Sequence, residues 1–280
     1  MSLFLRHQLR LAALARLNNG GTQATRSAPA PAPELHLYEY EASPWCRKVR
    51  ETLCVLGLKS LVLPCPRETL IMEGAFSSLS PHKKKVKDVG GELLFPFLVD
   101  VTKGVQLNQS ADICKYLWSE YGQEVTERPA TDSFLNSGKL PSLVDFALLT
   151  APSGLRPLPS HGLLAAKAKQ PKLPLVLEGC EPDPDSKRVR ETLCVLQLAY
   201  ESLPRERAAG AKLLDPNTGA ELEGADAIIQ HLDDEYRLGG SLPYNSPPPN
   251  PNLGDAHRRS WLAAPVELLT KGMKRSGVAV

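Results

Sequence analysis

The sequence predicts an α/β protein made of two tandem copies of one unit with the element order βαβαββα. The main observation is an exact internal repeat, because residues 49–56 and 189–196 both read VRETLCVL. An offset of 140 residues is far longer than the period of stacked repeats, so it indicates a duplicated domain. Further along, residues 98–100 recur as residues 213–215 at an offset of 115, which predicts a second copy shortened by 25 residues.

The first unit begins with a strand and a capped helix. Residues 35–40 alternate apolar and polar positions as a strand does. Ser43 followed by Pro44 is a typical helix start, because the hydroxyl accepts a free backbone N–H and proline suits the first helical position. Apolar residues at helical spacing then predict a helix over residues 44–56, and Gly57 is a suitable left-handed stop.

The rest of the first unit follows the same order. Residues 59–63 predict a short strand, and the lysine-rich stretch around residues 83–87 predicts a polar helix that ends at two glycines. Three more elements complete the unit: strands over residues 95–100 and 105–107, and a helix over residues 110–121.

These motifs, taken in order, carry a family resemblance. A strand, then SPWCRKVRE at a helix start, then FPFLVD and NQSADICKYL resemble the glutathione-binding, thioredoxin-like domain that opens glutathione S-transferases and is shared with glutaredoxins. The resemblance covers roughly residues 35–122, and the tandem arrangement is similar to a plant and algal family of duplicated proteins of this type. The expected domains are 1–33 (transit-like), 34–122 (thioredoxin-like), 123–172 (linker with a short apolar helix), 173–240 (degenerate second copy) and 241–280 (proline-rich tail).

The resemblance implies a glutathione site in the first copy. Phe95 would offer its backbone to the cysteinyl part of glutathione, with Pro96 as a cis-proline. Ser110 would bind the γ-glutamyl carboxylate at a helix N-terminus, where the helix dipole favours negative charge. Gln109 stands where the family more often has glutamate, so an amide would replace a carboxylate and weaken the site. Three of these residues also have a purely structural interpretation: Ser110 as a helix cap, Pro96 as a strand terminator and Gln109 as a surface side chain.

The reactive position has two candidates. Ser43 takes the place of the nucleophilic cysteine of glutaredoxins, and its hydroxyl could instead hydrogen-bond the thiol of bound glutathione and stabilise the thiolate. Cys46 matches the second cysteine of the C-x-x-C pattern, on the apolar side of the helix, where a small core residue is as good an interpretation as a redox thiol. Capping alone also explains Ser43.

The second copy lacks all of the implied site. The aligned residues are Asp183 for Ser43, Ser186 for Cys46, Ala211 for Pro96, Gly224 for Gln109 and Ala225 for Ser110. Core positions are kept, since Ile113, Leu117 and Tyr121 match Ile228, Leu232 and Tyr236. We therefore expect the second copy to be a packing partner or docking surface. The shortening itself has two explanations, a genuine deletion or a faulty gene model.

Composition excludes some functions. A formal net charge of +2 gives no reason to expect nucleic acid as a partner. The six cysteines show no C-x-x-C pair and no metal-ligand spacing, and Cys65, between two prolines, is expected to be the most exposed thiol. No apolar run is long enough for a membrane span, and the 40 residues after Gly240 are too few for the all-helical second domain of ordinary transferases.

The first 33 residues have the composition of an organelle transit peptide. They contain no acidic residue, and on a helical wheel Leu11 and Leu14 lie opposite Arg10 and Arg16. The family resemblance favours a chloroplast over a mitochondrion. The alternatives are a disordered basic tail or an amphipathic helix that packs on the fold.

Three functions remain open on the sequence. The first is a glutathione transferase in which Ser43 activates the glutathione thiol toward a small electrophile. The second is a glutaredoxin-like thiol–disulfide oxidoreductase that acts on protein thiols through Cys46. The third is a non-catalytic module that binds glutathione or a peptide. Glutathione is the expected ligand or cosubstrate, no metal is expected, and the sequence does not indicate the oligomeric state.

Overall fold

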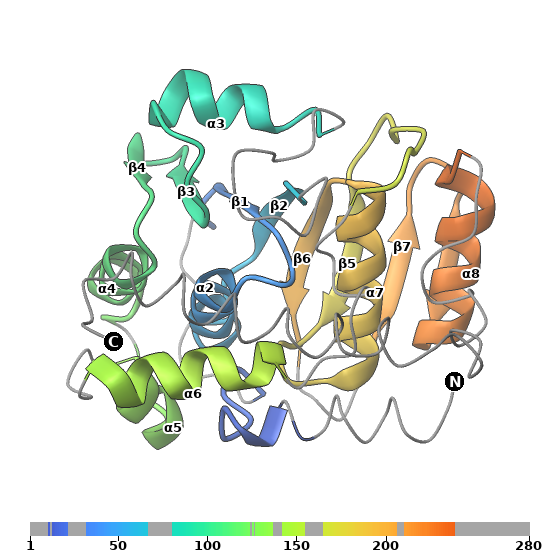
Figure 1. The fold of residues 1–280 in the computed structure, drawn as a ribbon. Coiled ribbons are helices and arrows are strands. Elements are labelled where there is room, and N and C mark those ends of the chain that lie inside the picture. The colour runs from blue at the N-terminus through green and yellow to red at the C-terminus, as the bar shows by residue number, and fades with distance from the viewer. Residues whose placement is uncertain are drawn as a thin grey trace, which may run out of the picture.

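The computed structural model contains one continuous mixed sheet with helices packed on it (Figure 1). The strand order is β4-β3-β1-β2-β6-β5-β7-β8. The structure describes residues 11, 13–21, 32–66, 80–123, 125, 127–136, 142–154, 165–205 and 210–238. The expected tail 241–280 and most of the expected transit-like segment lie outside these residues.

The first half of the sheet has the elements that the sequence predicts. In chain order they are β1 (Leu35–Glu39), α2 (Pro44–Val55), β2 (Ser60–Pro64), α3 (Lys83–Gly90), β3 (Phe97–Asp100), β4 (Val105–Leu107) and α4 (Ser110–Tyr121). Ser43 caps α2 by accepting the N–H of Cys46 at 3.3 Å, and Gly57 follows the helix with a φ of +59°. The mixed α/β architecture fits a thioredoxin-like fold.

The second half has the same order of elements, without a described counterpart of α3. It consists of β5 (Leu175–Gly179), α7 (Pro184–Leu196), β6 (Tyr200–Pro204), β7 (Lys212–Asp215), β8 (Ala220–Glu223) and α8 (Ala225–Tyr236). Asp183 caps α7 and accepts the N–H of Ser186 at 2.6 Å. The capped starts of α2 and α7 are therefore equivalent in geometry and differ in charge.

The two halves join through one strand pair. β2 and β6 are antiparallel, with Ser60 opposite Ser202 and Val62 opposite Tyr200. Val62 packs into the apolar core of the second half, beneath α7 and α8. We call this β2–β6 junction, together with the facing sides of α2 and α7, the seam.

Two apolar cores cover the two faces of the first half. Leu37, Val49 and Leu117 belong to the core beneath α2 and α4. Tyr38, Phe97 and Val86 belong to a smaller core on the opposite face, and Val86 comes from α3. The helix α3 therefore covers a sheet face that carries aromatic residues.

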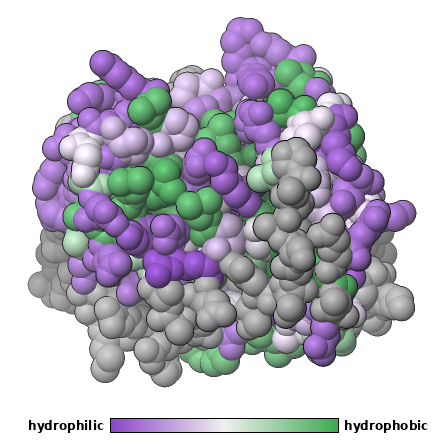
Figure 2. Space-filling model, turned by 180° about the vertical axis from the view of Figure 1, so that it is seen from behind, coloured by the Kyte–Doolittle hydropathy of each residue, from purple (hydrophilic) through white to green (hydrophobic). Residues whose placement is uncertain are grey.

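The corresponding face of the second half carries charged residues. Glu178 and Lys212 stand at the positions of Tyr38 and Phe97. Glu178 pairs with Arg205 at 3.2 Å, and Lys212 pairs with Glu221 on the next strand. Seen from behind, the molecule shows hydrophobic residues that gather left of the centre, with hydrophilic side chains around them (Figure 2). Paired charges suit a sheet face that no described helix covers, because they keep their contact with water.

The connection between the halves contains two helices. They are α5 (Ala130–Leu135) and α6 (Ser142–Gly154), and α6 runs across the base of α2 (Figure 1). The sequence predicts one short apolar helix in this region, at the apolar residues 140–149, and α6 contains most of them. Arg128, just before α5, stacks its guanidinium 4.1 Å from the ring centre of Trp118 on α4.

Candidate functional site

The predicted site residues meet at one edge of the first half of the sheet. Tyr40 and Phe95 extend the β1–β3 pairing, and their rings contact edge to face with centres 6.3 Å apart. The β3–β4 register places Gln109 beyond the strand ends on the side of Pro96. The backbone N–H of Ser43 donates to the carbonyl of Tyr40 at 3.0 Å, so the start of α2 lies at this edge too.

The backbone at Pro96 has the geometry that the resemblance implies. The Phe95–Pro96 peptide bond is cis. Phe95 is partly exposed, while Pro96 is buried at the start of β3. The backbone of Phe95 thus lies at the sheet edge between the starts of α2 and α4.

The start of α4 has no side-chain cap from its N-cap residue. The helix begins at Ser110, which is 9% exposed, and Gln109 is the N-cap residue with an extended backbone. The side chain of Gln109 makes no capping hydrogen bond, so it leaves the first-turn N–H groups uncapped. Asp112, an exposed carboxylate in the same turn, was not singled out from the sequence because a first-turn acid is ordinary helix chemistry.

Ser43 and Cys46 are both buried at the start of α2. Ser43 is 1% exposed, and its oxygen accepts the N–H of Cys46 as a helix cap. Cys46 is fully buried; this burial raises the pKa of its thiol well above the ordinary value, and the nearby carboxylate of Glu39 adds to the increase. Hydrogen bonding from Ser43 and the charge of Arg50 offset only part of the change. Cys46 therefore lies in a site that disfavours the reactive thiolate.

All six cysteines of the chain are buried. The expectation that Cys65 is an exposed thiol is therefore wrong. Cys65 is fully buried beside Tyr38 and Val86, under α3, and burial raises the pKa of its thiol to about 12. Two flanking prolines suggest a surface turn, but the contact with α3 is tertiary and leaves no local signal in the sequence.

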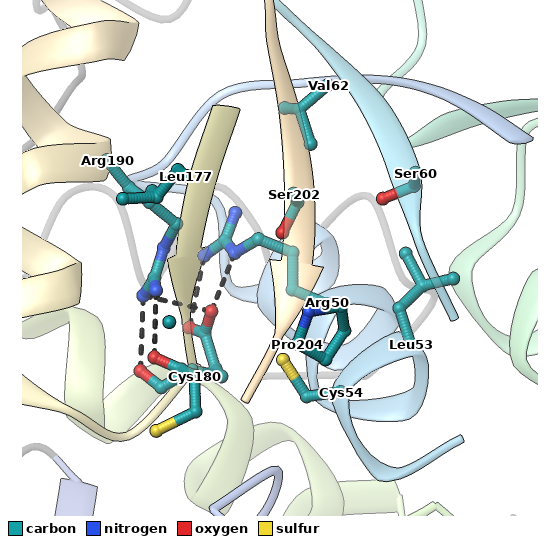
Figure 3. Close-up of a pocket in the computed structure, with 12 residues that line it drawn as sticks. Arg50, Leu53, Cys54, Ser60, Val62, Leu177, Cys180, Arg190, Ser202 and Pro204 are labelled. Carbon is teal, nitrogen blue, oxygen red and sulfur yellow. Dashed lines mark hydrogen bonds and ion pairs between the residues drawn. The ribbon is translucent and has the colours of Figure 1, made fainter. Parts of the chain in front are cut away.

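The seam contains a buried ion cluster that sequence reasoning missed. Arg50 on α2 donates to Glu181 of the second half at 2.8 Å, and Arg190 on α7 donates to Glu41 of the first half at 3.2 Å. Each arginine also contacts the glutamate of its own half, at 3.1 Å for Arg50–Glu41 and 3.0 Å for Arg190–Glu181. Figure 3 shows the two guanidinium groups meeting at this point. We call these four residues the seam quartet.

Two further charged residues lie beside the seam quartet. Arg47 lies 3.6 Å from Glu181, and Glu39 forms a very short contact with Arg50. Although burial alone would raise the pKa of Glu181, the positive charges of Arg190 and Arg50 lower it well below the ordinary value. Buried charges of this kind are tolerated only when they are paired and hydrogen-bonded.

A small cavity lies beside the quartet and is not a glutathione site. Its volume is about 20 Å³, and its lining includes Cys54, Ser60, Cys180 and Ser202 (Figure 3). A space of this size holds about one water molecule, so a tripeptide cannot fit. Within the described part of the chain, no group of three or more His, Cys, Asp or Glu side chains is placed to hold a metal ion. No described helix is both long and apolar enough to cross a membrane.

Comparison with known proteins finds a similarity in the first half of the chain. Residues 37–125 match the family model described as glutathione S-transferase, N-terminal domain. The match covers roughly a third of the chain and includes all the predicted site residues, from Ser43 to Ser110. No curated protein matches the chain. Residues 37–125 are thus similar to the N-terminal domain of glutathione S-transferases, and the mixed α/β architecture fits the thioredoxin-like fold of that domain.

Proposed function

We propose that the first half binds glutathione at the sheet edge formed by Ser43, the cis Phe95–Pro96 peptide and the start of α4. The observation that carries this proposal is the convergence of three elements at one edge of a domain of the matching family. The uncapped N-terminus of α4 supplies backbone N–H groups and a positive dipole for the γ-glutamyl carboxylate. Asp112 supplies the negative charge for the glutamyl ammonium that Gln109 cannot supply.

The chemistry that best fits this site is glutathione transfer to a small electrophile. Ser43 accepts one backbone N–H, and its hydroxyl would stabilise the glutathione thiolate at the positive end of α2 in place of its present hydrogen bond to the Cys46 thiol. Because Ser43 is buried, bound glutathione would reach it only after neighbouring side chains move aside. Thiol–disulfide exchange through Cys46 is the weaker alternative, since burial disfavours its thiolate.

We further propose that the chain is a tandem duplication whose second copy is shortened and has lost the site. The repeated order of elements supports this, as does a matched pair of contacts: Tyr121 donates to Asp100, and Tyr236 donates to Asp215. Asp183 would repel a thiolate where Ser43 would stabilise one. The second copy therefore serves as the structural partner that forms the seam.

The charged face of the second half favours a genuine deletion over a faulty gene model. Removing a helix from an intact copy would leave aromatic residues bare on the sheet. Glu178 and Lys212 replace those aromatics, so the sequence is adapted to the loss of the covering helix. We keep as proposals the plant and algal family type and an organellar, preferably chloroplast, location, for which the composition of the N-terminal segment is the support.

Calorimetric titration of glutathione into the full chain tests the binding proposal. We expect saturable binding that Ser110→Ala weakens about tenfold, the change expected on losing a hydrogen bond to a charged group. Ser119→Ala, at the exposed far end of the same helix, is the matched control and should leave binding unchanged. Absence of binding to the folded wild-type chain would contradict the site and favour an interaction module for proteins.

The transferase proposal needs a separate measurement. Conjugation of glutathione to an activated aryl halide should fall about tenfold or more in Ser43→Ala, because one unit of thiol pKa changes the thiolate fraction tenfold. Binding of glutathione, measured in parallel, should change much less. Full conjugation activity in Ser43→Ala would exclude Ser43 as the activating group, and binding without turnover in the wild type would indicate a non-catalytic module.

A further inference from the structure

Residues 13–21 lie against the folded domains, although the sequence predicts that they belong to a removable leader. Arg16 is 2% exposed and Asn19 is 2% exposed. The segment lies near α5 and α6 at the base of the molecule (Figure 1). It contacts three separate parts of the chain, namely α2, α5 and the loop that precedes α7.

Arg16 makes the central contact. Its Nε and Nη2 donate to the two carboxylate oxygens of Glu51 at 3.0 and 2.6 Å. Glu51, on α2, is 1% exposed. A bidentate ion pair between a planar guanidinium and a carboxylate is among the most directional contacts in proteins, and burial removes competing water.

Asn19 connects the segment to α5. Its side-chain amide donates to Glu51 at 3.1 Å and to Asp132 at 3.3 Å, and its oxygen accepts from Thr131 at 3.4 Å. Asp132 is fully buried and also accepts a hydrogen bond from Arg128, which lies just before the same helix. The same asparagine thus joins a residue of the first domain to a residue of the connection.

Gly20 shows how closely the backbone fits. Its φ is +80°, and a Cβ at this position would lie 3.2 Å from the Cα of Glu51 and 3.3 Å from the Cβ of Glu181. Any other residue would therefore be strained and crowded here. Leu17 and Asn18 also have left-handed φ values, of 51° and 54°. The backbone follows a specific path that places Arg16 and Asn19 inward.

Hydrophobic burial does not explain this contact. Leu11, Leu14 and Leu17 are 42%, 55% and 51% exposed, whereas the arginine is buried. The polar side of the segment faces the protein and the apolar side faces outward. The recognition is therefore mainly electrostatic and directional, through the buried carboxylate of Glu51 that binds the Arg16 guanidinium.

We propose that the surface formed by Glu51 and Asp132, which we call the acidic groove, is a binding site for an arginine-containing peptide segment, and that residues 13–21 of this chain are its occupant. The folded protein accordingly retains these residues. The segment joins the first domain, the connection and the second half in one contact, close to the seam quartet.

The test uses the full chain and a labelled synthetic peptide with the sequence of residues 11–21. In the wild type the groove is occupied, so the peptide should bind weakly. In Arg16→Ala the resident segment loses its anchor, and the peptide should bind about tenfold more tightly or better, as expected when charged hydrogen bonds decide the competition. A peptide with alanine in place of arginine, and the double variant Arg16→Ala/Glu51→Gln, are the matched controls and should show no such gain. Equal binding to all variants, or no binding to Arg16→Ala, would overturn the proposal.

A second measurement covers the case in which Arg16→Ala does not fold. Trypsin cleavage after Arg16 in the wild-type chain, followed by mass spectrometry, should be at least about tenfold slower in the native protein than in the urea-unfolded protein. Arg16→Lys preserves the cleavage site and a positive charge but loses the bidentate ion pair with Glu51, so it should be cleaved faster than the wild type. Native Arg16 that is cleaved as fast as in the unfolded chain would show that the groove is empty in solution.

Discussion

Leu61 and Glu201 lie directly opposite each other in the β2–β6 pair, and the two positions are separated by the repeat offset of 140 residues. The neighbouring pairs are Ser60 with Ser202 and Val62 with Tyr200, so the pairing runs symmetrically outward from this point. Equivalent edges of two equivalent units therefore meet as in the isologous interface of a homodimer. The crossed contacts Arg50–Glu181 and Arg190–Glu41 follow the same symmetry.

Removing the charge of a buried carboxylate of the seam quartet should destabilise the chain much more than removing the charge of an exposed carboxylate. Glu181→Gln leaves two arginines short of a buried counter-charge and should destabilise the chain by about 3–5 kcal/mol. Asp226→Asn, which removes the exposed partner of Arg188, should cost under about 1 kcal/mol. Urea unfolding of both variants gives the comparison. Similar losses in the two variants would mean that the quartet is hydrated and not buried in solution.

Thiol reactivity provides a test of cysteine burial. Because all six cysteines are buried, an aromatic disulfide reagent near neutral pH should label none of them rapidly in the native chain and all six after unfolding. Rapid labelling of Cys46 would instead support the oxidoreductase alternative. Cys46→Ser, compared with Cys114→Ser at another buried cysteine, would identify the responsible thiol.

The pH dependence of stability should contain a contribution from Asp215. Although burial alone would raise its pKa, hydrogen bonds from Tyr236, His231 and Asn217 lower the pKa of Asp215 well below the ordinary value. A lowered pKa in the folded state means that the unfolded state binds more protons as the pH falls. The stabilisation is thus complete above the ordinary aspartate pKa of about 4 and is lost below it.

Asp215→Asn should therefore reduce stability at pH 7 and flatten its decline between about pH 4 and pH 2. Thermal unfolding across this range measures both effects. Asp88→Asn, a change at an exposed ion pair on α3, serves as the control. An unchanged acid profile in Asp215→Asn would exclude this residue as a source of acid sensitivity.

The two helix caps should differ in strength. Ser43→Ala removes one 3.3 Å cap bond and should cost about 1 kcal/mol. Asp183→Ala removes a carboxylate that accepts both the N–H and the hydroxyl of Ser186 at 2.6 Å, so the loss should be larger, about 2 kcal/mol. Chemical denaturation of the two variants tests the order, and a larger loss in Ser43→Ala would contradict it.

The sequence by itself determined the local elements and their order. Caps such as Ser43 and Asp183, the stop at Gly57 and the apolar spacing of the repeated helix act within a few residues of the chain, so a linear pattern reports them. The positions of the predicted glutathione-site residues at strand and helix ends follow from the same local signals. The repeat also indicates that the two halves are related, which no single segment shows.

Only the tertiary structure decided how the halves meet and which polar residues are buried. Arg50 and Arg190 belong to the polar side of the repeated helix, a pattern that usually faces water, and here each faces the glutamate of the other half. Arg16 resembles a residue of a leader peptide, yet it is buried against Glu51. The physical reason is the same in both cases, because a buried charge is stabilised by a partner distant in sequence, and hydrophobic periodicity carries no information about that partner.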